Sequence, residues 1–463
     1  MNRSLLIRNA LVVATMDDQE REIAHGAVLI RGNRVEAVGP TDALPDSADT
    51  IIDASGCVVV PGLINTHHHM YQTLTRAVPG AQDCDLFDWL RRLYPIWSGL
   101  TPEMIRVSTH TAMAELILSG CTTASDHLYI YPEACRLDDS IEAAAEIGMR
   151  FHACRGSMSV GESKGGLPPD RVVEDEATIL RDSQRLIETW HDAADGAMLR
   201  IALAPCSPFS VSQDLMRESA AMARHYGVGL HTHLAETVGD VAYSRERFGR
   251  TPAQYAEDLG WTGEGVWHAH CVCLDDHGIE LFARTRTGVA HCPSSNMRLG
   301  SGVAPIRKMI DAGVPVSLGV DGSASNDAGH LLLEARMALL LARVRRSDDG
   351  SGDGSGNPAA LSARQALRIA TRGGAAALGR QDIGSLAPGK CADIAIFDVS
   401  GPTHAGALHD PLAALLFAAP AGVKHCIING REVVRDGVLL TVDVPRLTET
   451  HNGLARTLVQ GHP

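Results

Sequence analysis

Two histidines at alternate positions, His67 and His69, follow an apolar run near the start of the 463-residue chain. Residues 57–60 read Cys-Val-Val-Val, a composition that favours a buried strand, and residues two apart on a strand point to the same face. The spacing therefore predicts that His67 and His69 share one ion while His68 points away. A packed histidine cluster is the alternative, but three histidines at one strand end favour metal binding, because imidazole is the commonest metal ligand.

Three further residues of the types that bind metals end later strand-like runs: His233, His270 and Asp321. If these runs are neighbouring parallel strands, their ends converge with His67 and His69 on one opening. Neutral imidazoles with a carboxylate suit a divalent transition metal, and zinc is the ion we expect, with iron as the alternative. Such an ion lowers the pKa of a bound water to about 7 and supplies a nucleophile at neutral pH.

Glu236 follows His233 by three residues and is predicted to lie over the same opening. A carboxyl group beside a metal-bound water can carry a proton to the substrate, which is general acid-base catalysis. The alternative is a carboxylate in the first turn of a helix, where the helix dipole favours negative charge. His231 points the same way as His233 but deeper, so we expect a packed histidine there.

The elements that position these residues repeat between residues 61 and 375. Strand-like runs alternate with segments whose apolar residues recur every three or four positions, as in amphipathic helices. This alternation predicts an α/β fold, a (β/α)8 TIM-like barrel whose site lies at the carboxyl ends of the strands. The eight runs are the histidine segment and residues 121–126, 150–155, 200–205, 228–233, 265–270, 288–292 and 314–321.

Both chain ends carry short strand patterns separated by turns. The first lies within residues 1–60 and the second within residues 376–443, so the two ends flank the long central domain at 61–375. We expect them to pair into one small β-sandwich domain outside the barrel. Residues 444–463 are expected to form a C-terminal helix.

Composition limits the partners of the chain. Its net charge is -14, with no long block of Lys or Arg, which argues against nucleic acid or an anionic membrane and favours a small heterocyclic substrate. The N-terminus lacks the pattern of a signal peptide, and no apolar stretch reaches the roughly 18 residues of a membrane span. Eleven cysteines without regular spacing suit a reducing compartment. We expect a cytoplasmic homo-oligomer.

The chain resembles the amidohydrolase superfamily through residues 61–69, 231–237, 269–271 and 318–326. The resemblance covers nearly the whole sequence and points to the branch of mononuclear metal-dependent deaminases. It implies one metal on His67, His69, His233 and Asp321, with His270 holding the water. Members with two metals carry a lysine at the end of the fourth strand, where this chain has Ala-Pro-Cys at 204–206, so a second metal is not expected.

Within that branch, residues 67–76, 155–159 and 204–210 resemble the 8-oxoguanine deaminases. The resemblance implies hydrolysis of 8-oxoguanine to uric acid and ammonia, a reaction at a C–N bond of a cyclic amidine. Glu236 would protonate a ring nitrogen, while His270 and Asp321 would accept and pass on the water proton. The substrate contacts expected at the barrel mouth are Gln72, Arg155, Ser157 and Cys206.

Other substrates and one other class of protein remain open. Gln72 can both donate and accept hydrogen bonds, which matches a lactam edge, although it could also be an ordinary glutamine on a helix surface. Adenosine-type members usually have histidine where Cys206 stands, which argues against a nucleoside. The alternative substrates are pterins such as isoxanthopterin and hydroxylated s-triazines. A non-catalytic metal-binding scaffold would lack a ligand or the proton carrier, and neither is missing.

Overall fold

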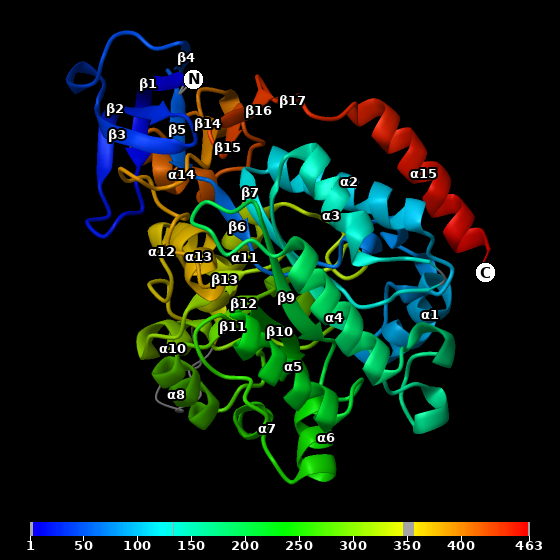
Figure 1. The fold of residues 1–463 in the computed structure, drawn as a ribbon. Coiled ribbons are helices and arrows are strands. Elements are labelled where there is room, and N and C mark those ends of the chain that lie inside the picture. The colour runs from blue at the N-terminus through cyan, green and yellow to red at the C-terminus, as the bar shows by residue number, and fades with distance from the viewer. Residues whose placement is uncertain (1–2, 133, 346–355, 462–463) are drawn as a thin grey trace.

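The computed structural model describes residues 3–132, 134–345 and 356–461. Its centre is a closed barrel of parallel strands in the order β10-β11-β12-β13-β6-β7-β8-β9, with helices around it (Figure 1). The predicted (β/α)8 barrel is therefore confirmed. Its strands are β6 (Leu63–Asn65), β7 (Cys121–Leu128), β8 (Arg150–Ser157), β9 (Leu199–Pro205), β10 (Gly229–Leu234), β11 (Val266–His270), β12 (Gly288–His291) and β13 (Val316–Leu318).

Helices connect successive barrel strands and cover the outside of the barrel (Figure 1). None of the described helices is long and apolar enough to cross a membrane. The described α-helices are α1 (Leu86–Trp97), α2 (Pro102–Leu118), α3 (Leu137–Ile147), α4 (Glu176–Trp190), α5 (Gln213–Tyr226), α6 (Val238–Phe248), α7 (Pro252–Asp258), α8 (Asp276–Thr285), α9 (Pro293–Arg298), α10 (Ile306–Ala312), α11 (Leu331–Val344), α12 (Ala363–Arg368), α13 (Gly374–Ala377), α14 (Pro411–Phe417) and α15 (Val444–Gln460). Helices α11 to α15 follow the last barrel strand. The segment 444–463, where we expect a helix, contains α15, and residues 462–463 lie outside the described chain.

A separate nine-stranded sheet is built from both chain ends, as the sequence predicts. Its central pair joins β5 to β14 in antiparallel register, with Ala395 opposite Val60. In Figure 1 this sheet stands beside one end of the barrel, with early and late strands mixed. The strands are β1 (Ser4–Ala14), β2 (Glu22–Arg31), β3 (Arg34–Pro40), β4 (Thr50–Asp53), β5 (Cys57–Pro61), β14 (Ile394–Asp398), β15 (His425–Ile428), β16 (Arg431–Arg435) and β17 (Val438–Leu439).

The apolar run at 57–60 does not carry the histidines, which corrects the prediction of a single strand. The run is β5 of the outer sheet, whereas the barrel strand β6 is a separate element that ends at Asn65. Gly62 separates the two, and a Cβ there would collide with the side chain of Thr122. The chain thus passes from one sheet into the other at a position where only glycine allows this close approach.

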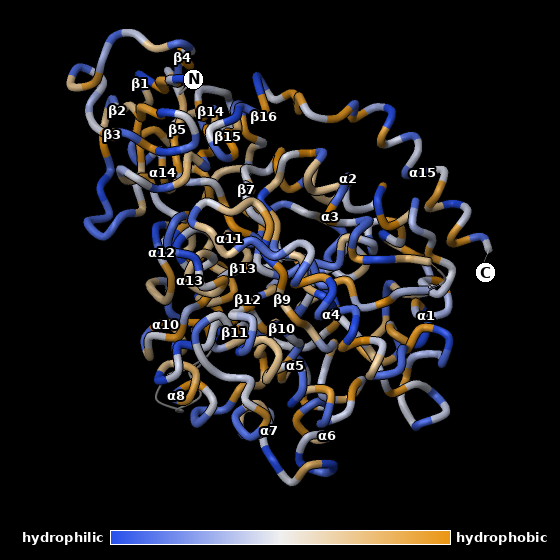
Figure 2. Tube along the Cα trace, in the orientation of Figure 1, coloured by the Kyte–Doolittle hydropathy of each residue, from blue (hydrophilic) through white to orange (hydrophobic). Residues whose placement is uncertain are grey.

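Small side chains that face inward from the strands fill the interior of the barrel. Cys154, Ala202 and Ala290 belong to one buried cluster with Trp267 and with Ala377, which lies beyond the last barrel strand. Figure 2 shows hydrophobic residues along the strands and hydrophilic residues over much of the outer surface. The barrel is therefore a packed core, and an open cavity is to be sought at its ends.

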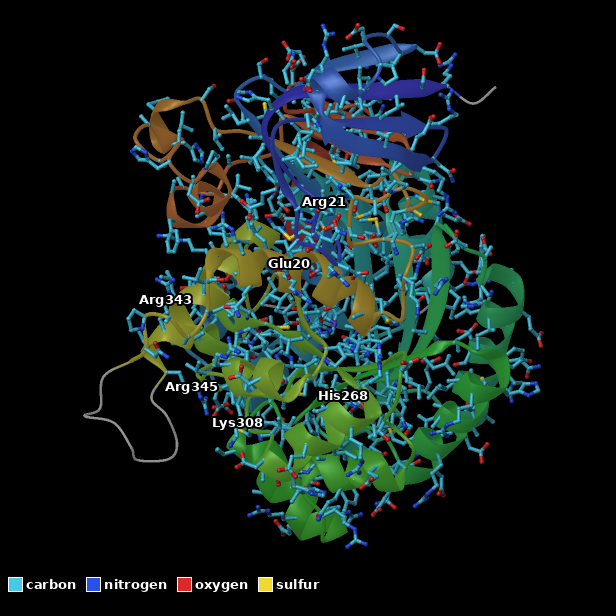
Figure 3. The ribbon with its side chains drawn as sticks, turned by 90° about the vertical axis from the view of Figure 1, so that its left-hand side faces the viewer. Glu20, Arg21, His268, Lys308, Arg343 and Arg345 are labelled. Carbon is cyan, nitrogen blue, oxygen red and sulfur yellow. The ribbon has the colours of Figure 1, made fainter. Side chains whose placement is uncertain are left out.

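Ion pairs join the outer sheet to the barrel helices. Glu20 and Arg21 lie where the outer sheet meets the barrel, and Figure 3 labels both. Three arginines spaced by four residues share one face of α12 and the helical turn after it. Each pairs with an acidic residue of segment 18–22, which connects β1 to β2 and includes the first residue of β2. The pairs are Arg364 with Glu22, Arg368 with Glu20, and Arg372 with Asp18. Because these groups are partly exposed, each pair adds little stability on its own.

A buried ion pair makes a stronger link between the same two parts. Arg150, at the start of β8, is fully buried and donates from Nε to Asp393 Oδ2 at 2.9 Å, just before β14. Its Nη1 donates to the carbonyl oxygens of Gly196 and Ala197 at 2.7 and 2.8 Å. Removal of Asp393 would therefore leave a buried guanidinium without its carboxylate partner.

We expect Asp393→Ala to lower the free energy of unfolding by about 3–5 kcal/mol, because it leaves a buried cation without a partner. Denaturant unfolding of the two proteins measures this difference. The double variant Arg150→Met/Asp393→Leu removes both charges and should recover most of the loss. Equal destabilisation by the single and the double variant would show that packing, not the unpaired charge, carries the effect.

Candidate metal centre and active site

Four of the predicted metal ligands meet at the carboxyl end of the barrel. His67 and His69 follow β6, His233 lies in β10, and Asp321 follows β13. The Nε2 atoms of His67 and His69 lie 3.2 and 3.4 Å from Asp321 Oδ1, and His69 Nε2 lies 3.1 Å from His233 Nε2. His68 is fully buried and accepts the backbone N–H of His69 at its Nδ1, a bond within its own segment.

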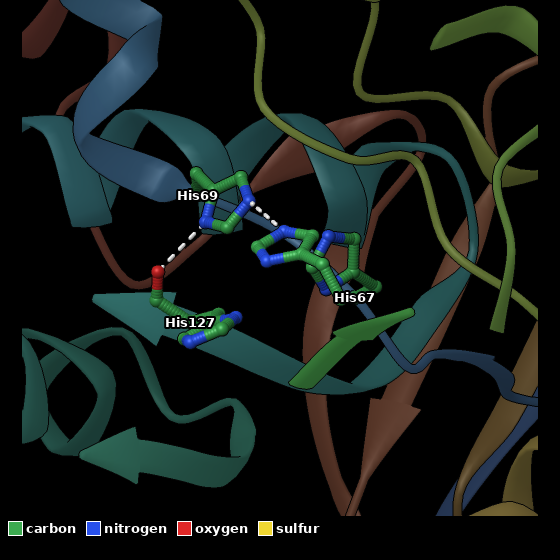
Figure 4. Close-up of side chains that lie close together, drawn as sticks. His67, His69 and His127 are labelled. Atoms are coloured by element: carbon green, nitrogen blue, oxygen red, sulfur yellow. Dashed lines mark hydrogen bonds between the residues drawn. The ribbon is translucent and has the colours of Figure 1, made fainter. Parts of the chain in front are cut away.

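Hydrogen bonds fix which nitrogen of two of these rings carries the proton. His69 Nδ1 lies 2.7 Å from the carbonyl oxygen of His127 (Figure 4), and His233 Nδ1 lies 2.6 Å from that of Cys206. A carbonyl oxygen only accepts, so each Nδ1 must carry the hydrogen. In each of the two neutral rings, Nε2 then carries no hydrogen and presents a lone pair. The 3.1 Å approach of these two Nε2 atoms is favourable only if a cation lies between or beside them.

His67 is held in the same protonation state, with its hydrogen on Nδ1, by a hydrogen bond to a second histidine. His231 Nδ1 lies 2.8 Å from the carbonyl oxygen of Trp267 and must donate to it. The Nε2 of His231 is therefore an acceptor, and it lies 2.7 Å from His67 Nδ1. His67 Nδ1 donates along this chain, which leaves His67 Nε2 unprotonated, buried and without a hydrogen-bond partner among the described residues.

The electrostatic environment keeps the cluster in a state that suits a metal. Burial lowers the pKa of His67 and His69, and it lowers that of His233 to about 3, so these rings are neutral at pH 7. Three bare imidazole nitrogens and one carboxylate are a donor set that a divalent transition metal fits.

Glu236 and His270 lie beside this cluster, as the sequence predicts. His270 Nε2 is 3.6 Å from Glu236 Oε2 and 3.8 Å from Asp321 Oδ2, and its Nδ1 is 2.8 Å from Asn296 Oδ1. Burial raises the pKa of Glu236 to about 7. A carboxyl group with this pKa is protonated in part of the molecules at neutral pH and can both give and take a proton.

Unusual backbone conformations aim these side chains. Ala235, His270 and Asp321 have φ values of 51°, 70° and 63°, in the left-handed region that non-glycine residues seldom adopt. Each lies at or just beyond the end of a barrel strand. The α6 helix then starts at once, because the N–H groups of Glu236 and Thr237 both donate to Asp240 Oδ2 at 2.9 and 3.2 Å. Such strain is typical of functional sites.

A cavity adjoins the cluster, and α1 covers it. Trp89 of α1 lines the cavity and donates its indole N–H to the carbonyl oxygen of Ala324 at 3.1 Å, which ties the helix to the segment after β13. Gln72 and Cys206 also line it, as predicted. Gln72 is fully buried, and a Cβ at Gly322 would collide with its amide, so that glycine makes room for the glutamine.

Arg155 and Ser157, the other two expected substrate contacts, do not line this cavity. The Arg155 guanidinium lies 4.1 Å from the Tyr131 ring centroid and pairs with Glu174 and Asp182, both at 2.8 Å. Its donors thus connect β8 to Glu174, which precedes α4, and to Asp182 within α4. Ser157 is buried, and its carbonyl oxygen accepts the N–H of Cys206 at 2.9 Å. The structure therefore places neither side chain at this cavity.

The sequence alone did not identify several residues of the site. His127 lies among the ligand imidazoles, with its Nε2 2.7 Å from the carbonyl oxygen of Ala204. Its position at the end of the second strand-like run was an available signal. Asn296 and Tyr129 had no signal, because one follows β12 within α9 and the other lies beyond β7 in a segment without a motif.

A (β/α)8 barrel with imidazoles and a carboxylate gathered at its strand ends defines a hydrolase barrel with a candidate metal site. The model of the amidohydrolase family matches residues 58–433. The chain belongs to the amidohydrolase family, and it is a deaminase-type hydrolase that acts on C–N bonds. A non-catalytic scaffold is thereby set aside.

Individual relatives match this chain over nearly their whole length. An 8-oxoguanine deaminase from Pseudomonas aeruginosa is 45% identical over 457 residues, covering 98% of this chain and 99% of the relative. An isoxanthopterin deaminase from an unknown prokaryotic organism is 37% identical, with 99% and 97% covered. An atrazine chlorohydrolase from Arthrobacter aurescens, solved with zinc, superposes with a TM-score of 0.91 at 36% identity, with 97% and 100% covered.

Proposed function

We propose that the chain hydrolyses 8-oxoguanine to uric acid and ammonia with the help of one divalent metal, for which zinc fits best. The observation that carries this proposal is the convergence of three unprotonated Nε2 atoms and the Asp321 carboxylate beside the Glu236 carboxyl. The identity of the substrate rests in addition on the 45% identical 8-oxoguanine deaminase.

His67, His69, His233 and Asp321 would hold the metal. When bound there, a divalent ion lowers the pKa of water and makes it a nucleophile at neutral pH. His270 would orient that water through Nε2, because its Nδ1 is engaged by Asn296. His270 Nε2 lies 3.8 Å from Asp321 Oδ2, and these two groups would accept and pass on the proton released by the water.

Glu236 would carry protons to the substrate. Its carboxyl protonates a ring nitrogen as water adds to the carbon that bears the amino group, and the C–N bond to that group then breaks. The nitrogen leaves as ammonia with the protons that the site has collected, and the ring keeps the water oxygen as a new carbonyl. The neutral carboxyl needed for the first step is accessible because burial raises the pKa of Glu236 to about 7.

Substrate choice would depend on the edge of the ring that faces away from the metal. An oxidised purine has a carbonyl on its five-membered ring that guanine lacks, and the Gln72 amide can donate to such an oxygen. Burial raises the pKa of Cys206 to about 12, so its thiol stays neutral and can act only as a weak donor. The isoxanthopterin deaminase relative makes a fused pterin lactam the second candidate.

In a substrate panel, we expect kcat/KM for 8-oxoguanine to exceed that for guanine by about 100-fold or more, with adenosine not turned over. A site built to hydrogen-bond a substrate group rejects an analogue without that group by a large factor. Ammonia release measured across purines, pterins and hydroxylated triazines provides the comparison. Equal rates on guanine and 8-oxoguanine would refute the recognition argument, and a preference for isoxanthopterin would select the second candidate.

His231→Phe tests the hydrogen-bond chain behind His67. The substitution removes the acceptor of His67 Nδ1–H, and we expect metal affinity or kcat to fall about 10- to 100-fold. His268 provides a matched control, because it is fully buried in β11 but bonds to the carbonyl oxygen of Trp261 and stacks on Phe282. Competition with a metal chelator compares the affinities. Equal losses of metal affinity and kcat in His231→Phe and His268→Phe would show that His231 acts only through packing.

A further inference from the structure

A second cavity, of about 390 Å³, lies at the opposite end of the barrel from the candidate active site. Its walls include Arg200 near the start of β9, Gly229 at the start of β10 and Val266 at the start of β11. This volume falls within the range of about 300–1,000 Å³ that is usual for small-molecule sites. Neither the metal cluster nor Glu236 lines it.

One cation in this cavity, Arg200, forms no direct ion pair with any residue of the described chain. Arg200 pairs with His152 across β9 and β8 and points to the same face of β9 as Ala202, which belongs to the barrel interior. Its Nε is buried without a hydrogen-bond partner, and no ion pair joins its guanidinium to another residue of the described chain. Burial lowers the pKa of Arg200 and the nearby Arg380 lowers it further, while Asp382 and Asp192 offset only part of this effect.

The neighbouring carboxylates are already engaged. Asp393 is paired with Arg150 at 2.9 Å and Asp382 with Arg380 at 2.6 Å, both among buried side chains. At the cavity wall, Glu264 pairs with Arg286 at 2.8 Å, and the nearby Asp192 is exposed to solvent. The three guanidinium groups around His152 are thus matched by two buried carboxylates, and Arg200 is the one left over.

A second donor in the same cavity also lacks an acceptor. His191 Nδ1 accepts the backbone N–H of Ile201 at 3.1 Å, so in the neutral ring the proton resides on Nε2. That Nε2 is buried without a partner among the described residues, and His191 lines the cavity. Arg224 stands at the exposed rim. Unpaired donors on Arg200 and His191 would be satisfied together by one anion.

We propose that this cavity binds a phosphate-type oxyanion, either free phosphate or a phosphoryl group carried on a small molecule. Arg200 and His191 would donate to it, with Arg224 adding positive charge at the rim. A phosphoryl group offers three strong acceptor oxygens, which suits donors that converge from different elements. The site is separate from the proposed deaminase centre, so it does not depend on the identity of the deaminase substrate.

Calorimetric titration of the metal-loaded enzyme with inorganic phosphate, at constant ionic strength, tests the proposal. We expect one phosphate per chain and a rise in Tm of about 1–3 °C over a sodium chloride control. Arg200→Met should weaken Kd about 10- to 100-fold, because it removes charge-assisted hydrogen bonds. Arg217→Met, an exposed residue of α5 that does not line the cavity, should leave Kd unchanged.

Phosphate bound at the catalytic metal is distinguished by Arg200→Met, because that binding would survive the substitution. Equal affinity of wild type and Arg200→Met, or no binding to either, would overturn the proposal. Arg224→Met, at the exposed rim, provides a second variant if Arg200→Met does not fold, and we expect it to weaken Kd severalfold. Ribose 5-phosphate is the parallel probe: tighter binding than inorganic phosphate identifies a carried phosphoryl group, and weaker binding identifies the free ion.

Discussion

Glu236→Gln is expected to retain the fold and the metal while losing about 100- to 10,000-fold in kcat. The amide has nearly the shape of the carboxyl, but it cannot take up and release a proton. The backbone N–H of Glu236 is fixed by Asp240 and the residue itself is 5% exposed, so a side chain of equal size should keep its place. Steady-state kinetics together with metal analysis measure the two parts of this expectation.

Glu334→Gln is the matched control for that variant. Glu334 is also buried, and burial raises its pKa to about 7 as well, but it accepts from Ser294 and Asn326 and does not line the cavity. We expect it to change kcat by less than about tenfold, as befits a lost structural hydrogen bond. If Glu236→Gln keeps nearly the wild-type rate, Glu236 is structural and the proton-transfer argument fails.

Removal of the metal by a chelator should abolish turnover, and one equivalent of zinc per chain should restore it. The reason is that free water, with a pKa near 15.7, is a weak nucleophile until a bound ion lowers that pKa to about 7. Elemental analysis of the purified protein should give one divalent ion per chain, because the three bare imidazole nitrogens and Asp321 provide one ligand set.

His233→Ala tests the same requirement for metal by substitution of a ligand. It removes one Nε2 lone pair from the cluster, and we expect the metal content and the activity to fall together. His268→Phe should leave both near wild type, since that ring bonds to Trp261 on the far side of β11. Two tightly bound ions per wild-type chain, or turnover that survives complete removal of the metal, would contradict the single-metal mechanism.

The sequence by itself determined the fold class and most of the reactive residues. Alternation of strand and helix patterns repeats along the chain, and the carboxyl ends of parallel strands in a closed barrel must face one opening. This geometric rule placed His67, His69, His233, His270, Glu236 and Asp321 together without any knowledge of side-chain contacts.

Only the tertiary structure decided which residues hold the metal ligands in place and which of the expected residues lie outside the site. Local pattern could not divide 57–69 between two sheets, because the crossover depends on how closely Gly62 approaches Thr122. The local pattern could not show that Arg155 lies outside the cavity, because its carboxylate partners are 19 and 27 residues away in the sequence. The protonation states of the ligands also depend on distant groups, since His67 is set by His231, 164 residues later. Hydrogen bonds between such remote residues exist only once the barrel has closed.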